Sequence, residues 1–201
     1  MDPGLPTGTV TLLFSDIEGS TSLLRRLGED YADALSAQRS LMRRAFARWH
    51  GREMGTEGDS FFVVFTSVGD AVCAVLQAQR DLARHAWPGG ERVRVRMGLH
   101  TGEPVRHEDG YIGIDVHLAA RVASVAAGGQ VVLTEAAQRI WSGHPLPDVS
   151  MLDLGRHRLK DIPEPVHLYQ LVVAVVVGSR VSPPRLRTGG KSRSSPSATS
   201  W

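Results

Sequence analysis

The sequence has a single cysteine, Cys73, and no apolar run of the roughly 18–20 residues that a membrane-spanning helix needs. One cysteine excludes an internal disulfide, and the surrounding AVCAVL predicts a small buried helix residue in a reducing compartment. The longest apolar run, residues 171–177, has only the length of a strand. The N-terminus lacks the charged-then-apolar pattern of a signal peptide. We therefore expect a cytoplasmic protein without a membrane partner.

Acidic residues are absent after residue 174, and this C-terminal stretch is basic. It supplies +5 to a formal net charge of +2, which leaves −3 for the first 174 residues. That part has no basic signature of nucleic-acid binding, so we expect no specific nucleic-acid partner. The Ser-, Pro- and Arg-rich composition of the tail predicts disorder, with weak binding to an acidic partner as the alternative.

The apolar periodicity predicts strands and helices that alternate along one domain of ordinary globular composition. Strands are expected at 9–16, 52–56, 60–66, 92–101, 130–133, 157–159 and 166–172, and helices at 20–27, 29–49, 68–85, 114–125 and 135–141. A tight turn at Glu57-Gly58 joins the second and third strands. This order favours an α+β fold, a ferredoxin-like palm with a βααββαβ core and a C-terminal α/β extension. We expect the single domain to span residues 8–173, between an N-terminal segment (1–7) and the disordered tail (174–201).

Two aspartates stand at the ends of strands that such a core places side by side. Asp16 ends the first expected strand and Asp59 begins the third, and these strands are antiparallel neighbours in a ferredoxin-like core. Two adjacent carboxylates repel each other unless a cation lies between them. Magnesium binds a few carboxylates together with substrate phosphates, and two such ions can activate an attacking oxygen and stabilise a leaving one. Taken singly, Asp16 reads as a helix-entry cap and Asp59 as a turn residue, but together they favour a metal site.

The loop after Asp16 opens the first expected helix and is a candidate phosphate cradle. It consists of Ile17, Glu18, Gly19, Ser20 and Thr21. Backbone N–H groups at a helix start favour phosphate oxygens, and a glycine permits close approach. The alternative is that Ser20 or Thr21 serves only as the N-cap of the helix.

Several blocks along the chain resemble the class III adenylate/guanylate cyclase catalytic domain, in its actinobacterial style. In order they are FSDIEGSTSLL, TEGDSFFVVF, MGLHTGEP, GYIGIDVHLAARVASVAAGGQVVLT and LGRHRLKDIPEPVHLYQL. They cover residues 8 to about 173, and several ordered blocks are far more specific than one short motif. The resemblance implies a ferredoxin-like palm, a head-to-tail homodimer with sites at its interface, and conversion of a purine nucleoside triphosphate to a 3′,5′-cyclic monophosphate and pyrophosphate.

The resemblance also implies roles for particular residues. Asp16 and Asp59 would bind two Mg²⁺ or Mn²⁺ ions, and the main-chain carbonyl of Ile17 would be a further ligand. Arg121 matches the arginine that stabilises charge on the phosphate in the transition state, a role that its planar guanidinium suits. Without the resemblance, Arg121 reads as a helix-surface arginine. Lys160 loosely matches a lysine that contacts the triphosphate, with a plain surface lysine as the alternative.

Three positions depart from the family pattern. The purine-reading lysine is replaced by Gly55, the purine-reading aspartate or threonine by Gly110 with Asp109 beside it, and the ribose-orienting asparagine by His117. Glycines cannot hydrogen-bond a base through a side chain, so we expect relaxed choice between ATP and GTP, with ATP favoured. His117 can replace the asparagine in part, through one donated hydrogen bond, or it packs at the dimer interface.

These departures leave two functions open. The first is a cyclase, slowed because the loss of a positioning group costs on the order of 100-fold. The second is a degenerate cyclase-like module that binds nucleotide and dimerises with little catalysis. A cyclase that joins two nucleotides is disfavoured, because the turn reads Glu57-Gly58-Asp59-Ser60-Phe61 and not GG(D/E)EF.

Overall fold

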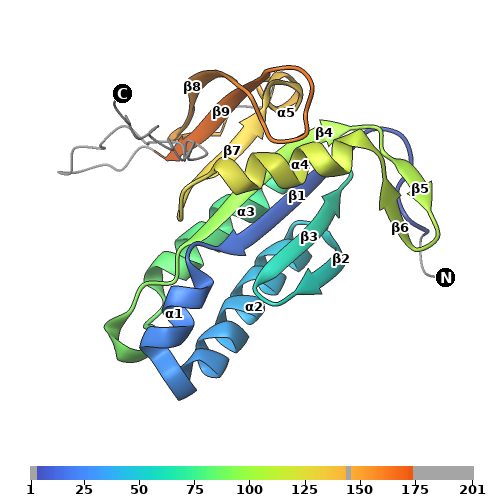
Figure 1. Cartoon of the computed structure of the whole chain (residues 1–201). Helices are drawn as coiled ribbons and strands as arrows, with labels where there is room; N and C mark the ends of the chain where they lie inside the picture. The colour runs from blue at the N-terminus through green and yellow to red at the C-terminus, as the bar shows by residue number, and fades with distance from the viewer. Residues whose placement is uncertain (1–3, 144–145, 174–201) are drawn as a thin grey trace, which may run out of the picture.

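The computed structural model describes residues 4–143 and 146–173 and forms one α+β domain around a mixed sheet. The strands are β1 (Val10–Ile17), β2 (Arg52–Glu57), β3 (Ser60–Phe65), β4 (Val95–Gly102), β5 (Val105–His107), β6 (Gly110–Ile112), β7 (Val131–Thr134), β8 (Val149–His157) and β9 (Val166–Val173). The helices are α1 (Ser20–Leu27), α2 (Tyr31–Arg48), α3 (Val68–Arg84), α4 (Ile114–Val125) and α5 (Glu135–Trp141), with short 3₁₀ turns at Gly28–Asp30 and Pro88–Gly90. Figure 1 shows this arrangement.

The main sheet has the strand order β2-β3-β1-β4-β7-β9-β8. Its first four strands form the expected ferredoxin-like core, in which β1 pairs antiparallel with both β3 and β4. The C-terminal extension joins through β7, which is parallel to β4, and β9 and β8 continue the sheet antiparallel. The predicted fold class and the mixed sheet are therefore confirmed.

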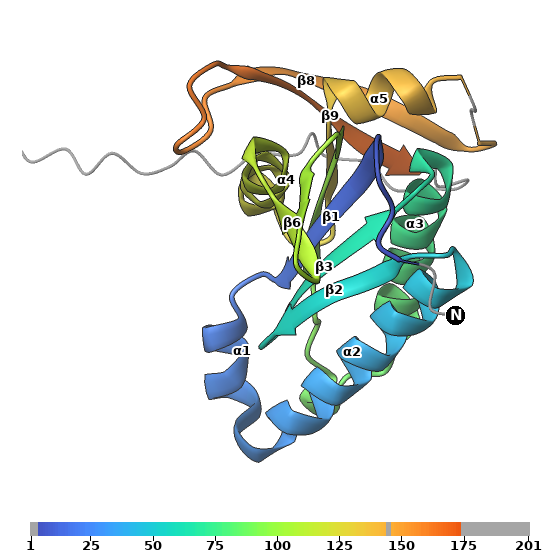
Figure 2. The same cartoon turned by 90° about the vertical axis from the view of Figure 1, so that its right-hand side faces the viewer.

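Helices cover the two faces of the sheet unequally. Leu13 and Ile17 of β1 pack with apolar residues of α2 and α3, in the larger of the hydrophobic clusters. The opposite face carries α4, and Figure 2 shows α4 on one side of the sheet with α2 and α3 on the other. Strand β4 accepts α4 closely because Gly98 has no side chain, since a Cβ there would lie 2.2 Å from the backbone nitrogen of Ala123.

Two details of the strands differ from the prediction. The strand expected at 157–159 is β8, which ends at His157 and begins at Val149, and a bulge between Asp153 and Gly155 interrupts its alternation. Asp and Gly have low strand propensity, which hides this strand in the sequence. The stretch between β4 and α4, for which no strand was expected, forms the β5–β6 hairpin, with Glu108 at a left-handed φ of 50° in its turn.

Three further predictions concern Cys73, membrane-spanning helices and the C-terminal tail. Cys73 is half-buried on α3 and not fully buried, and burial raises the pKa of its thiol. Within the described residues no helix is both long and apolar enough to cross a membrane. The predicted disordered tail (174–201) lies outside the described residues.

Candidate functional site

The carboxylate of Asp59 lies against the end of β1. Strand β1 pairs with β3 so that Ser15 faces Phe61, and the turn between β2 and β3 then brings Asp59 beside Ile17. The backbone N–H of Ile17 donates a hydrogen bond of 2.7 Å to Oδ2 of Asp59. The structure therefore brings Asp59 to Asp16 and Ile17, which precede it by 43 and 42 positions in the chain.

Asp16 is held by an arginine that the sequence analysis did not single out. Arg96 is its direct partner across the β1–β4 ladder. Its Nε donates to Oδ1 of Asp16, and its Nη2 donates to Oδ2 over 2.7 Å. These hydrogen bonds raise the pKa of Arg96 above its ordinary value, and the charges of Asp16, Glu18 and Asp59 act in the same direction against partial burial.

A sequence signal for Arg96 exists in the alternation of RVRVRM. Val95 and Met97 are fully buried on the α3 face, so the arginine between them must face the other way, where Asp16 lies. An arginine opposite a candidate metal aspartate can be found in this way once the pairing of β1 with β4 is assumed.

The donor set at this sheet end fits a hard divalent cation. Asp16 and Asp59 offer carboxylate oxygens, and the main-chain carbonyl of Ile17 is a neighbouring oxygen. Across the described ranges no three His, Cys, Asp or Glu side chains converge as a complete metal cluster. Such a site matches magnesium, which is bound by one or two carboxylates and completes its shell with water and substrate phosphates.

The loop from Ile17 to Thr21 is only partly free to bind an anion. The N–H of Ile17 is taken by Asp59, and the N–H of Glu18 donates to the carbonyl of Arg94 over 2.9 Å. The N-cap of α1 is Gly19, in the left-handed conformation (φ 66°), with no side-chain cap hydrogen bond. The alternative that Ser20 or Thr21 is the N-cap is therefore wrong. Their backbone N–H groups begin α1 and have no intrahelical acceptor.

The other candidate residues gather on α4 and the loop after β8. Arg121 donates through Nε to the carbonyl of Lys160 over 3.1 Å, and through Nη2 to Asp161 over 2.7 Å. His117 is exposed one helical turn before Arg121, on the same side of α4. This group forms no hydrogen bond or ion pair with Asp16 or Asp59 within the described part of the chain.

The positions expected to read the base are structurally open. Among the described residues, a Cβ built on Gly55, at a bulge of β2, meets nothing within 4 Å, and one on Gly110 approaches only the carbonyl of His107, at 3.9 Å. Side chains at both positions would therefore fit, and the glycines are not required by packing.

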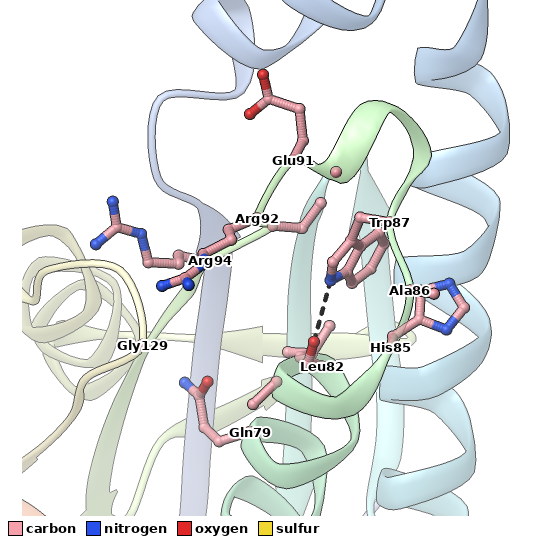
Figure 3. A pocket seen from close by; sticks show the side chains of 12 residues that line it. Gln79, Leu82, His85, Ala86, Trp87, Glu91, Arg92, Arg94 and Gly129 are labelled. Carbon is pink, nitrogen blue, oxygen red and sulfur yellow. Dashed lines mark hydrogen bonds between the residues drawn. The ribbon is translucent and has the colours of Figure 1, made fainter.

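A separate pocket of about 750 Å³ lies between the end of α3 and the start of β4. Figure 3 shows Arg92 and Arg94 on one side of it and His85 and Trp87 on the other. Trp87 is fixed by a hydrogen bond of 3.1 Å from Nε1 to the carbonyl of Leu82. Neither Asp16 nor Asp59 lines this pocket, so it is distinct from the candidate cation site.

The amino-acid sequence is similar to those of known proteins. A model of the adenylate and guanylate cyclase catalytic domain matches residues 5–172. An uncharacterized protein of Mycobacterium tuberculosis is 38% identical over 168 residues, which are 83% of this chain and 56% of the relative. The receptor-type adenylate cyclase GRESAG 4.3 of Trypanosoma brucei brucei is 32% identical over 211 residues, 84% of this chain and 17% of that protein.

The fold has a close match among solved structures. Adenylate cyclases from Trypanosoma brucei, solved in their monomeric state, superpose with a TM-score of 0.79 at 30% identity, over 85% of this chain and 90% of the matched chain. The chain spans about half or less of the length of the two curated relatives described above. The match to the family model covers nearly all of the described residues, and the chain belongs to the adenylate and guanylate cyclase catalytic domain family.

Proposed function

We propose that this chain is a slow nucleotide cyclase that converts a purine nucleoside triphosphate, ATP in preference to GTP, to its 3′,5′-cyclic monophosphate and pyrophosphate. It would act in cyclic-nucleotide signalling in the cytoplasm. The observation that carries the proposal is the hydrogen bond from the Ile17 N–H to Asp59, because it brings both acidic residues to one sheet end. The relatives that are named adenylate cyclases support the choice of reaction.

In this reaction the ribose 3′-oxygen bonds to the α-phosphorus, and the bond from that phosphorus to the pyrophosphate oxygen breaks. Asp16, Asp59 and the carbonyl of Ile17 would hold two Mg²⁺ or Mn²⁺ ions, which supply Lewis acidity for the attacking and leaving oxygens. The free N–H groups of Gly19, Ser20 and Thr21 would bind phosphate oxygens. Arg96 adds a positive charge beside Asp16, where the negative charge of the substrate would otherwise be repelled.

The remaining groups would act across a head-to-tail homodimer. Arg121 would stabilise charge on the α-phosphate, His117 would orient the ribose and Lys160 would contact the triphosphate, each in the site of the partner subunit. Arg121 and Lys160 already lie together at the surface, with Arg121 paired to an exposed Asp161. Exposed ion pairs contribute at most about 1 kcal/mol, so substrate phosphate can displace this one.

Exposed apolar residues mark a surface for the second copy. Val105, Ile112 and Ile114 are at least half exposed, on the β5–β6 hairpin and the first residue of α4. The hairpin is fixed to the domain, since Tyr111 Oη donates to the carbonyl of Pro6 over 2.7 Å. A rigid arm with apolar side chains beside the helix of Arg121 suits a dimer contact.

The test is a cyclase assay with ATP and GTP, in Mg²⁺ and in Mn²⁺, at several protein concentrations. We expect cyclic nucleotide from the wild type and none from Asp16→Ala. The rate per protomer should rise with protein concentration, because a site shared between subunits forms only in the dimer. No product above the Asp16→Ala control at high protein concentration would refute the proposal.

A second candidate function is a binding and dimerisation module with little catalysis, and Gly55, Gly110 and His117 favour it. The two glycines place no side chain toward a base. The combined variant Gly55→Lys, Gly110→Asp, His117→Asn separates the two functions. A combined variant that makes cyclic nucleotide while the wild type makes none above the Asp16→Ala control supports the module. Measurable turnover by the wild type supports the slow cyclase, even where the combined variant is about 100-fold faster.

A further inference from the structure

A polar residue of α2 lies buried beneath the candidate cation site. Gln38 has no exposed surface, and its neighbours one turn away on the same face, Ala34, Leu41 and Met42, are apolar core residues. Its Nε2 donates to the carbonyl of Asp59 over 3.5 Å, whereas its Oε1 has no hydrogen-bond partner among the residues that the structure describes. A buried polar atom without a partner costs about 1–3 kcal/mol, so Gln38 is a costly residue at this position.

The next residue of α2 holds the same turn from the surface. Arg39 donates to the carbonyl of Gly58 through Nε over 3.1 Å and through Nη2 over 2.5 Å. Gly58 has a left-handed φ of 56°, which sets the direction in which the chain leaves the turn. Two consecutive residues of α2 thus hold two consecutive carbonyls of the β2–β3 turn.

Asp59 is consequently restrained from two sides. Its carbonyl faces Gln38 on α2, while its carboxylate accepts the N–H of Ile17 on β1. The hydrogen bonds from α2 fix the main chain on both sides of the Asp59 Cα. The position of this main chain in turn limits the positions that the Asp59 carboxylate can occupy. Residues that orient a metal ligand in this indirect way change metal affinity about 10–100-fold when they are removed.

We propose that Gln38 and Arg39 are positioning residues that hold the two peptide groups on either side of the Asp59 Cα, through the carbonyls of Asp59 and Gly58, and thereby set the affinity of the Asp59 carboxylate for a divalent cation. The proposal rests on the proposed function, because it assigns the cation to Asp16 and Asp59. It explains why a glutamine with an unpaired oxygen lies in the apolar interface between α2 and the sheet. If Gln38 had a purely structural role, its replacement would lower the stability of the protein and leave its affinity for the cation unchanged.

The test compares Gln38→Met and Arg39→Met with the wild type in the full chain. Gln38→Met keeps the length of the side chain and removes both polar atoms. Arg44→Met is the matched control, since Arg44 is an exposed arginine of α2 that donates a hydrogen bond to Ser40 of its own helix. Mn²⁺ binding is titrated by electron paramagnetic resonance in the presence of 3′-deoxy-ATP, which cannot cyclise, and thermal unfolding is measured without metal.

We expect the Mn²⁺ dissociation constant to rise about tenfold in Gln38→Met and in Arg39→Met, and to stay unchanged in Arg44→Met. The Tm of Gln38→Met should equal or exceed that of the wild type, because an unsatisfied buried oxygen is gone. In turnover, the Mn²⁺ concentration for half-maximal rate should rise while the rate at saturating Mn²⁺ is largely recovered.

Dissociation constants within twofold of the wild type in both variants overturn the proposal. If Gln38→Met does not fold, Arg39→Met, at a half-buried position, decides the question alone. Asp59→Asn separates this outcome from failure of the proposed function. If the wild type and Asp59→Asn bind Mn²⁺ equally, the cation site itself is wrong, whereas loss only in Asp59→Asn removes the positioning role and leaves the site intact.

Discussion

Arg96 binds both carboxylate oxygens of Asp16, although the two residues lie 80 positions apart in the chain. The pairing follows from the register of β1 and β4, in which these two residues face each other. The Arg96 side chain is 17% exposed and that of Asp16 30%, so the ion pair is only partly screened by water. In the absence of a cation, this arginine neutralises the carboxylate that the proposed reaction needs.

Replacing Arg96 by methionine should destabilise the metal-free protein and make its stability depend on divalent cations. Removing one partner leaves Asp16 uncompensated beside Asp59, at a cost of roughly 1–3 kcal/mol for a partly exposed pair. Thermal unfolding in EDTA and in about 10 mM Mg²⁺, roughly a thousandfold above a dissociation constant of about 10 μM, measures both effects. Equal Tm losses with and without Mg²⁺ would show that Asp16 does not bind the cation.

Replacing Gly98 by alanine should destabilise the domain by displacing α4. The new Cβ would lie 2.2 Å from the backbone nitrogen of Ala123, and backbone cannot yield as a flexible side chain can. Overpacking of this kind costs about 1–3 kcal/mol. Gly55→Ala is the control, because a Cβ there meets nothing within 4 Å. Urea denaturation of both variants is the measurement, and equal midpoints would contradict the close packing of α4 on β4.

The wild type should discriminate weakly between ATP and GTP. With no side chain at Gly55 or Gly110 to hydrogen-bond the base, the ratio of kcat/KM values should stay below about 200, the range typical of contacts without hydrogen-bond readout. Gly55→Lys with Gly110→Asp should raise the ratio in favour of ATP by about tenfold or more. The measurement is initial rates with each purine at equal metal concentration. A wild type that already rejects GTP by 10⁴-fold, the order reached by sites that read a base through hydrogen bonds, would contradict this.

Stability should fall in mild acid because of His100. Burial lowers the pKa of this histidine below its ordinary value of 6.5, although the hydrogen bond and charge of Asp115 oppose the shift. The folded state therefore favours the neutral ring, which bonds Thr134 over 2.9 Å and Asp115 over 3.0 Å. The contribution of His100 to the free energy of unfolding is complete above pH 6.5. It decreases as the pH falls below this value, since the unfolded chain then binds the proton more readily than the folded one.

Chemical denaturation of the wild type and of His100→Gln between about pH 7.5 and about pH 5.5, one unit either side of an ordinary histidine pKa, measures this effect. We expect a shallower pH dependence in His100→Gln than in the wild type. Parallel pH profiles for the wild type and His100→Gln would rule out His100 as the source.

Much of the fold was predictable from local patterns. The strict alternation around Arg96 and the apolar stripes of α2 and α3 mark elements whose burial is periodic, and these were placed within a few residues. Strand β8 and the β5–β6 hairpin were not, because Asp153, Gly155 and Glu108 have low strand propensity and their pairing depends on distant partners.

The sequence by itself identified the candidate residues, because Asp16, Asp59 and Arg121 stand in motifs that indicate their chemistry without a structure. Only the tertiary structure decided their surroundings. In the folded chain the Ile17 N–H donates a hydrogen bond to Asp59, and Arg96 donates to Asp16. The Glu18 N–H donates to the carbonyl of Arg94, and Gln38 donates to the carbonyl of Asp59 in the β2–β3 turn. The physical reason is that a hydrogen bond between strands or from a helix depends on register and packing, which are set by the whole core and not by neighbours in sequence.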